Sequence, residues 1–251
     1  MIRKFFLLCL FSSSAYAVPT APPPISSGLV PEGNLRLFLN HDPYSVYTEF
    51  TAAAETDQRS FKAVTLGGYY QAIQNLKLGA FYRIAYGLRH NEDWMSMNGK
   101  WSWADTNSRG ESLWILDATP KATLGFISMD HWVAELKTRL INNIFDHEQT
   151  LFLRPGLTYF WLKDQQAFLN FFLQYEMQFP LNYGTSTINE QWLYFGALYR
   201  LLSDLDVGAY TALKWETWDS PAVYLAKGGT PFSLTAQSYV LGLVAVFQFG
   251  I

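Results

Sequence analysis

The sequence is poor in residues that bind metals or form covalent cross-links. Its one cysteine, Cys9, lies in an N-terminal segment that we expect to be removed, so a mature chain would contain no disulfide or cysteine-ligated metal. Its four histidines are scattered, and no two have the spacing of a metal site (His41, His90, His131 and His147). The net charge of −3 is small and gives no indication of a nucleic-acid partner. We therefore expect no metal and no cofactor.

Long hydrophobic runs are also missing. After residue 17 no apolar run approaches the roughly twenty residues that a transmembrane helix needs. Yet 49% of the residues are hydrophobic and 17% are aromatic, so the fold must place a large apolar surface without a transmembrane helix. An exported chain of this kind is either a secreted all-β domain or an outer-membrane barrel whose apolar residues are spread over alternating strands.

The N-terminal residues have the layout of a secretory signal peptide. Arg3 and Lys4 are basic, an apolar stretch follows, and Ala15-Tyr16-Ala17 forms a small-x-small cleavage site. We expect residues 1–17 to be this signal peptide and residues 18–44 to be a proline-rich periplasmic linker and lead-in. Within the lead-in, Asn34–His41 alternates weakly and could be an extra strand, a plug segment or simply the approach to the barrel.

A two-residue alternation of apolar and polar side chains dominates the chain from residue 45 onwards. In the segment Trp132–Asn143, for example, Glu135, Lys137 and Arg139 alternate with apolar residues, whereas a helix would scatter them around its circumference. The final segment, Ala236–Ile251, carries no charge. Alternate residues give it one face of large apolar side chains and one face of smaller, mixed side chains. The predicted strands are Val46–Glu55, Phe61–Ala72, Lys77–Leu88, Ser112–Leu124, Trp132–Asn143, Thr150–Leu162, Ala167–Gln178, Gln191–Leu202, Val207–Trp218 and Ala236–Ile251. Pro120 predicts an irregularity in its strand, because proline cannot donate to a ladder.

The connections support a membrane barrel, because outer-membrane barrels have short periplasmic turns and longer external loops. With the C-terminus in the periplasm, short and long connections alternate back along the chain; residues 203–206 are a short one and 219–235 a long one. The exception is the connection at residues 56–60, which would be external yet short. The prediction is an all-β, antiparallel transmembrane β-barrel of about ten strands (range about 8–12) over residues 45–251. We expect Ala236–Ile251 to close it by pairing with Val207–Trp218 and Val46–Glu55. An even strand count would leave the linker in the periplasm.

Together, the cleavage site, the alternating strands, the loop rhythm and the aromatic end of the last strand resemble a small Gram-negative outer-membrane β-barrel protein. The terminal Phe247-Gln248-Phe249-Gly250-Ile251 is similar to the signal read by the barrel-assembly machinery, although it ends on Ile rather than Phe. The resemblance concerns the architecture and nearly the whole mature chain. It implies residence in the cell outer membrane, contact with lipid and lipopolysaccharide, and insertion by that machinery.

The face opposite the lipid carries charges of both signs and is the candidate functional surface. Its predicted lumen-lining residues are Glu49, Arg83, Asp117, Lys121, Glu135, Lys137, Arg139, Arg154, Glu176, Arg200, Lys214 and Glu216. They form either a salt-bridge network that fills the barrel or a narrow polar pore. In the second case the basic residues would attract anionic solutes, namely Lys137, Arg139, Arg154, Arg200 and Lys214.

Two functions follow from these observations. The first is a narrow, porin-like passive channel for small polar solutes. The alternative is a non-conducting structural or surface-binding barrel that acts through its outer loops, where Trp94, Trp101 and Trp103 belong either to an aromatic girdle or to a recognition surface. We expect no enzyme, because His41, Asp42 and Ser45 lie in one short segment and no catalytic pattern of strand-borne residues is present.

Overall fold

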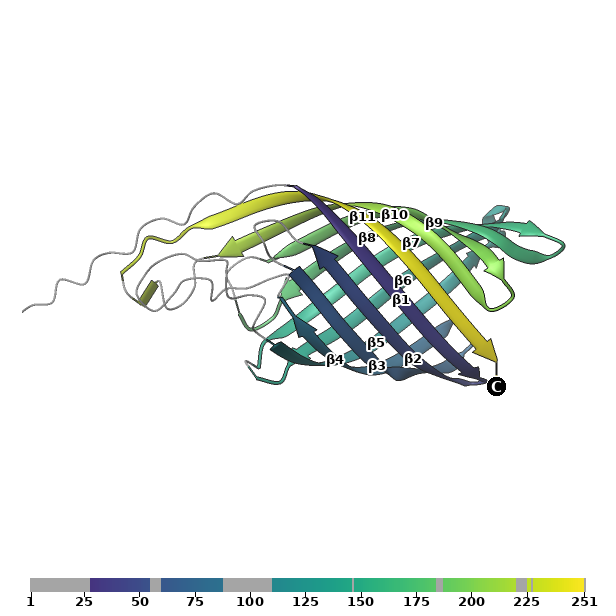
Figure 1. Ribbon diagram of the computed structural model, residues 1–251, viewed down its shortest axis with the longest axis horizontal. Helices are drawn as coiled ribbons and strands as arrows, with labels where there is room; N and C mark the ends of the chain where they lie inside the picture. The colour runs from purple at the N-terminus through teal and green to yellow at the C-terminus, as the bar shows by residue number, and fades with distance from the viewer. Residues whose placement is uncertain are drawn as a thin grey trace, which may run out of the picture.

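The computed structural model describes residues 28–54, 60–87, 110–145, 147–183, 187–219, 225–226 and 228–250. These residues form a closed barrel of eleven strands (Figure 1). The strands are β1 (Leu29–His41), β2 (Tyr44–Ala54), β3 (Ser60–Ile73), β4 (Leu76–Tyr86), β5 (Gly110–Leu124), β6 (Met129–Asn143), β7 (Gln149–Lys163), β8 (Gln166–Pro180), β9 (Glu190–Leu202), β10 (Leu205–Asp219) and β11 (Ser233–Gly250). A single 3-10 turn, η2 (Gly125–Ile127), lies between β5 and β6. Within the described residues no helix has the length and hydropathy needed to cross a bilayer.

The all-β prediction is confirmed, and each predicted strand is present with its ends shifted by a few residues. The segment Trp132–Asn143, for instance, lies within β6, which begins at Met129. The predicted signal peptide at residues 1–17 lies outside the described residues. Alternation located the strands well because every strand of the barrel has one face towards the interior and one face outwards.

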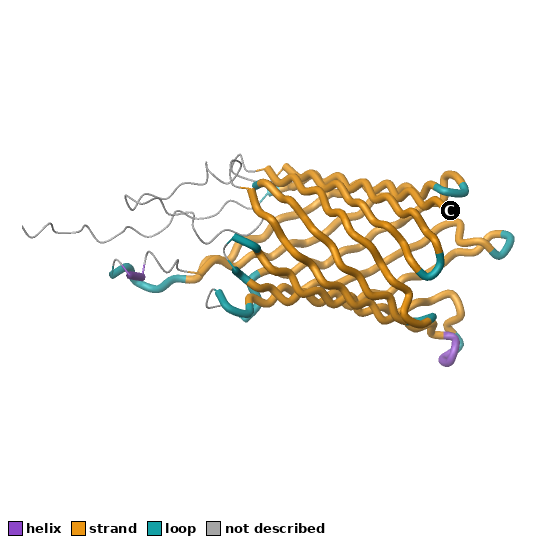
Figure 2. Tube along the Cα trace, turned by 90° about the horizontal axis from the view of Figure 1, so that it is seen from below, coloured by secondary structure: helices purple, strands orange, loops and turns teal. Residues whose placement is uncertain are grey.

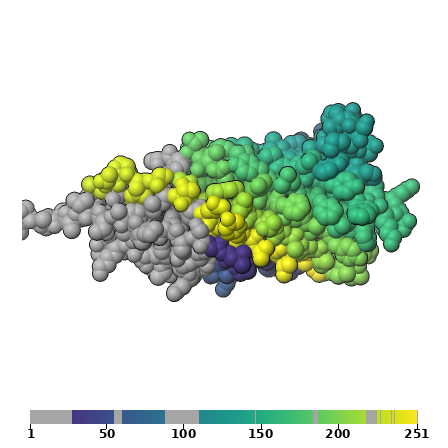
Figure 3. Space-filling view, turned by 90° about the horizontal axis from the view of Figure 1, so that it is seen from above, coloured from purple at the N-terminus to yellow at the C-terminus, as the bar shows by residue number. Residues whose placement is uncertain are grey.

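The closure of the barrel differs from the prediction. Strand β11 pairs with β10 and, in parallel, with β1; Leu35 is opposite Ala245 in this seam. Strand β1 then pairs with β2 in the antiparallel sense. Thus Asn34–His41 is a strand, the barrel begins at residue 29 and not 45, and the segment Val46–Glu55 is not the neighbour of β11. Figure 3 shows β11 in yellow beside β1 in purple on the outer surface.

Parallel closure also changes where the chain enters the barrel. Because β1 and β11 run in the same direction, Leu29 lies at the end where β11 starts, which is the end of the long connections (Figure 1). The short turns and Gly250 lie at the opposite end (Figure 2). Eleven strands lie within the predicted range of about 8–12. The expected even count, which would have put the start of the barrel at the end of the short turns, is wrong.

The hydrogen-bond ladder between β5 and β6 is interrupted at Pro120, as expected for a residue without a backbone N–H. Between β5 and β6 the pairs pass from Ala118 and Thr138 directly to Lys121 and Glu135. The register is the same on both sides of this gap, so the proline interrupts the ladder without inserting a residue.

The two faces of the wall differ sharply in composition. The outward face carries large apolar side chains that remain exposed, such as Leu66, Trp114, Leu116, Phe195 and Leu243. The inward face combines buried aromatic residues with most of the charged groups of the strands. The interior of the barrel is therefore the polar compartment of this molecule.

Candidate functional site

The barrel encloses a cavity of about 520 Å³ lined by side chains from all eleven strands of the described structure. Its lining contains as many basic as acidic side chains, but they are unevenly distributed. The basic ones are Arg36, Lys77, Arg83, Lys121, Lys137, Arg139 and Arg154; the acidic ones are Glu32, Glu49, Glu111, Glu135, Glu148, Glu176 and Glu190. Three buried carboxylates, Asp117, Glu176 and Glu49, form ion pairs with the basic residues inside the barrel.

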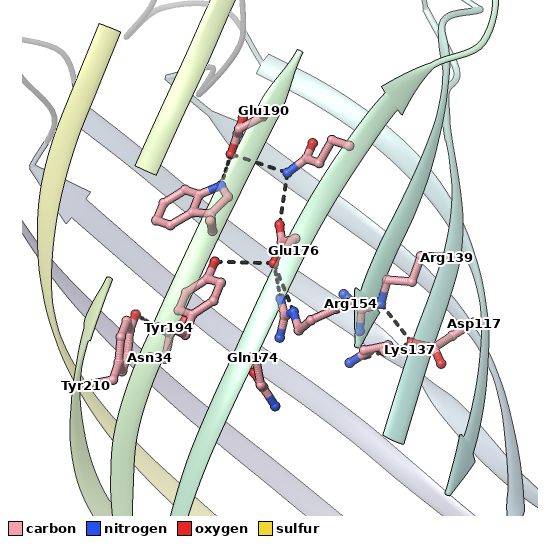
Figure 4. Close-up of polar contacts among 12 residues, drawn as sticks. Asn34, Asp117, Lys137, Arg139, Arg154, Gln174, Glu176, Glu190, Tyr194 and Tyr210 are labelled. Carbon is pink, nitrogen blue, oxygen red and sulfur yellow. Dashed lines mark hydrogen bonds and ion pairs between the residues drawn. The ribbon is translucent and has the colours of Figure 1, made fainter. Parts of the chain in front are cut away.

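Asp117 on β5 is the first of these carboxylates, and its side chain is fully buried. Its Oδ2 accepts a hydrogen bond of 2.7 Å from Nε of Arg139, the residue directly opposite on β6. Its Oδ1 accepts one of 2.7 Å from the hydroxyl of Thr119. Lys137 Nζ is more distant, at 3.6 Å from Oδ2 (Figure 4). Asp117 therefore pairs closely with one cation and only loosely with the second.

Glu176 on β8 is the second centre. Arg154 on β7 binds its Oε2 through NH2 at 2.6 Å and Nε at 2.9 Å. The same oxygen accepts from the hydroxyl of Tyr194, and Oε1 accepts from Gln178, which also donates to Glu190 (Figure 4). Both oxygens of this carboxylate therefore accept from a donor, and its pairing with Arg154 is charge-assisted.

Glu49 on β2 is the third centre and joins two arginines from different strands. Arg36 of β1 donates to its Oε1 at 3.2 Å, and Arg83 of β4 approaches its Oε2 at 3.7 Å. Arg83 also donates to the hydroxyl of Thr65. Arg36 was not among the predicted lumen residues, because its strand was interpreted as part of the lead-in.

Aromatic rings pack against two of these arginines. The guanidinium of Arg139 lies 5.8 Å from the ring centre of Phe81 and 5.7 Å from that of Phe152. Arg154 lies 5.0 Å from Phe152 and 5.2 Å from Tyr194. Such rings attract a cation through their quadrupole but, unlike a carboxylate, have no net negative charge to neutralise it.

The basic residues of this region converge across the lumen. Arg154 lies directly opposite Lys137 on β7, and Arg139 binds the Asp117 oxygen that Lys137 approaches. Arg36 lines the same cavity, although it belongs to β1. Counting Arg83, five cationic side chains are grouped around the three carboxylates Asp117, Glu176 and Glu49. This group, which we name the central basic cluster, consists of Arg36, Arg83, Lys137, Arg139 and Arg154 and carries an excess of positive charge.

The structure divides the basic patch that the sequence predicted. Lys137, Arg139 and Arg154 belong to the central basic cluster, but Arg200 is paired with Asp206 near the short turns and does not line the cavity. Lys214 is fully buried, forms an ion pair with Glu216 and lies over the ring of Trp192. Lys121 pairs with Glu135 at 3.1 Å and is half-exposed.

An aromatic cluster inside the barrel also escaped the sequence prediction. Phe38, Tyr47, Tyr69 and Phe81 contact one another, and Lys77 lies 4.8 Å from the ring centre of Tyr69. Their inward positions follow from alternation, but only the barrel brings β1 to β4 close enough for the rings to meet. This cluster narrows the interior on that side.

Other predicted features lie elsewhere or outside the description. Trp94, Trp101 and Trp103 lie outside the described residues. Within the described part of the chain, no group of three or more His, Cys, Asp and Glu side chains is placed to hold a metal ion.

Comparisons with known proteins add no family. No protein-family model matches this sequence. No curated protein matches it either.

Proposed function

We propose that this protein is an integral β-barrel of the cell outer membrane and acts as a narrow passive channel for small polar solutes, with a mild preference for anions. In this proposal it is exported by its signal peptide and inserted by the barrel-assembly machinery, which reads the C-terminal strand. Its outer wall contacts lipid and lipopolysaccharide. It has no enzymatic activity and needs no cofactor.

The outer wall supports residence in a membrane. Large apolar side chains stay exposed on strands all around the wall, for example Val46, Leu66, Leu116 and Leu241. The strands contain between 11 and 18 residues, and a tilted strand needs about 9–11 to cross the hydrocarbon core. Exposed apolar area of this extent would be unfavourable in water.

The observation that carries the channel proposal is the interior cavity within a closed wall, whose lining combines charged and polar groups with aromatic rings. Charged side chains that line a pore can select ions and small solutes. The excess of cations in the central basic cluster supports the preference for anions.

The interior also supports the second candidate, a non-conducting barrel. The ion pairs of Asp117, Glu176 and Glu49 and the rings of the aromatic cluster occupy much of a narrow barrel. In that case any function would belong to the outer loops, including Trp94, Trp101 and Trp103.

Two features differ from the usual bacterial barrel. Single-chain bacterial barrels have even strand numbers, whereas the described residues form eleven strands with a parallel seam. With the short turns in the periplasm, the chain would enter β1 from the external side. Protease protection in intact cells, with a cleavage site inserted just before Leu29, would test this orientation.

Planar-bilayer recording of the refolded protein tests the channel itself. We expect discrete conductance steps and a reversal potential that favours anions. Arg139→Ala and Arg154→Ala should each lower the anion-to-cation permeability ratio, because each removes a cation from the central basic cluster. An absence of steps over a wide voltage range would contradict the channel and favour the non-conducting barrel.

A further inference from the structure

The carboxylates of the barrel centre are already engaged by other residues. Asp117 accepts from Arg139 and Thr119, and Glu176 accepts from Arg154, Tyr194 and Gln178. Glu49 faces Arg36 and Arg83. None of these three carboxylates is therefore left to neutralise another cation closely.

Lys137 is the cation that this arrangement leaves undercompensated. Among the described residues, the carboxylate oxygen nearest to its Nζ is that of Asp117 at 3.6 Å, which is beyond hydrogen-bond distance. Its side chain lines the cavity and is 20% exposed. An ammonium group has three donors, so Lys137 presents unused donors to the interior.

The surroundings of Lys137 increase the local positive potential. Arg139 binds the same Asp117 oxygen that Lys137 approaches, and Arg154 is the residue directly opposite Lys137 on β7. Arg36 lines the same cavity from β1. Asp117 and Glu176 each already pair with one of these arginines. The rings of Phe81, Phe152 and Tyr194 beside them add no negative charge that could compensate Lys137. Like charges repel strongly where little water screens them, and an anion placed among them relieves that repulsion.

From this geometry we infer that Lys137, with Arg36, Arg139 and Arg154, forms a binding site for a small oxyanion, a carboxylate or phosphate group, in the middle of the lumen. Lys137 is its direct ligand, and the three arginines supply the field. Figure 4 shows the side chain of Lys137 between those of Arg154 and Asp117. The inference deepens the proposed channel, since the anion reaches the site through the lumen.

The size of the cavity fits this class of ligand. Its volume of about 520 Å³ exceeds that of a single small anion, so acetate-sized or phosphate-sized groups can enter with some of their water. The guanidinium groups of Arg139 and Arg154 both lie over the Phe152 ring, which fixes their positions beside the oxyanion site.

Equilibrium binding tests the site independently of conduction. Trifluoroacetate would be titrated with the refolded protein in detergent micelles, with its 19F line width as the readout, and inorganic phosphate would be added as competitor. We expect saturable broadening that phosphate reverses. Lys137→Gln should weaken binding about tenfold, the effect of losing one charge-assisted contact, and Lys137→Arg should retain most of it.

Arg200→Gln is the matched control, because it removes one positive charge that does not line the cavity. It should leave trifluoroacetate binding unchanged, and each variant should keep its heat-modifiable migration in gels. Equal binding by folded Lys137→Gln and the unsubstituted protein would overturn the site. Lys137-dependent binding without conductance steps would refute the channel alone, whereas steps without Lys137-dependent binding would refute the site alone. Displacement of trifluoroacetate by acetate but not by phosphate would restrict the site to carboxylates.

Discussion

The inner face of β6 and β7 and that of β11 are stabilised in different ways. The first carries Lys137, Arg139 and Arg154, whose counter-charges Asp117 and Glu176 come from the flanking strands β5 and β8. The second has no charge, and its inward residues are small or β-branched: Ser238, Val240, Gly242, Val244 and Val246. Their contacts are steric, so one wall depends on electrostatic pairing and the other on fit.

Tyr210 shows how the uncharged wall is organised. Its ring lies over Gly242 on the neighbouring strand, where a Cβ atom would overlap it. Its hydroxyl reaches the lumen side of β1, donating to Glu32 and accepting from Asn34. The lack of a side chain at Gly242 therefore lets Tyr210 connect β10 to β1 beneath β11. The closure of β11 against β1 brings these residues within reach.

The largest expected effect is on the charged wall. Asp117→Asn should lower the free energy of unfolding by about 3–5 kcal/mol, because it leaves Arg139 buried without its counter-charge. Urea unfolding of the barrel in lipid vesicles, followed by tryptophan fluorescence, measures the change. Glu135→Gln is the control: it breaks the pair with half-exposed Lys121 and should cost no more than about 1 kcal/mol. Equal costs for the two substitutions would contradict the role of burial.

A somewhat smaller effect should appear on the outward face of β11. Leu243, near the middle of this strand, is 69% exposed, and Leu243→Arg should destabilise the barrel in vesicles by about 2–4 kcal/mol if that face meets the bilayer core. Leu202 is also exposed but ends β9 beside a short turn. Leu202→Arg should therefore cost at most about 1 kcal/mol. Similar small costs at both positions would argue against a membrane around this wall.

The smallest of the three effects concerns the fit between Gly242 and Tyr210. Gly242→Val should cost about 1–3 kcal/mol by overpacking, measured by the same unfolding experiment. Gly33→Val on the neighbouring strand is the control, because no atom lies within 4 Å of a Cβ placed there. Adding Tyr210→Ala to Gly242→Val should recover part of the loss. A full cost in the double variant would mean that the ring is not what excludes the side chain.

Much of the barrel could be predicted from the sequence because its pattern is local. Glu49, Asp117 and Arg139 alternate with apolar neighbours, and this alone indicated which side of each strand they occupy; all three are buried inside the barrel. Arg36 and the parallel seam were missed for a different reason. The segment around Arg36 alternates only weakly, and no local feature says that the first strand follows the direction of the last.

The contacts within the lumen depend on distances that the sequence does not contain. Lys137, Arg200 and Lys214 look alike as inward basic residues, yet Arg200 lies near the short turns and Lys214 is buried against Trp192. Strand order, tilt and register decide which inward residues share a level of the barrel. These quantities arise only when all eleven strands close.

The all-β architecture, the position of most strands and the side each residue faces follow from the amino-acid pattern, because a period of two residues is a property of neighbours along the chain. The parallel pairing of β11 with β1, and the presence of Arg36 in the same cavity as Lys137, Arg139 and Arg154, follow only from the closed barrel. Closure is a global condition on the whole wall. It places residues that are about a hundred positions apart in the sequence, such as Arg36 and Lys137, around one cavity.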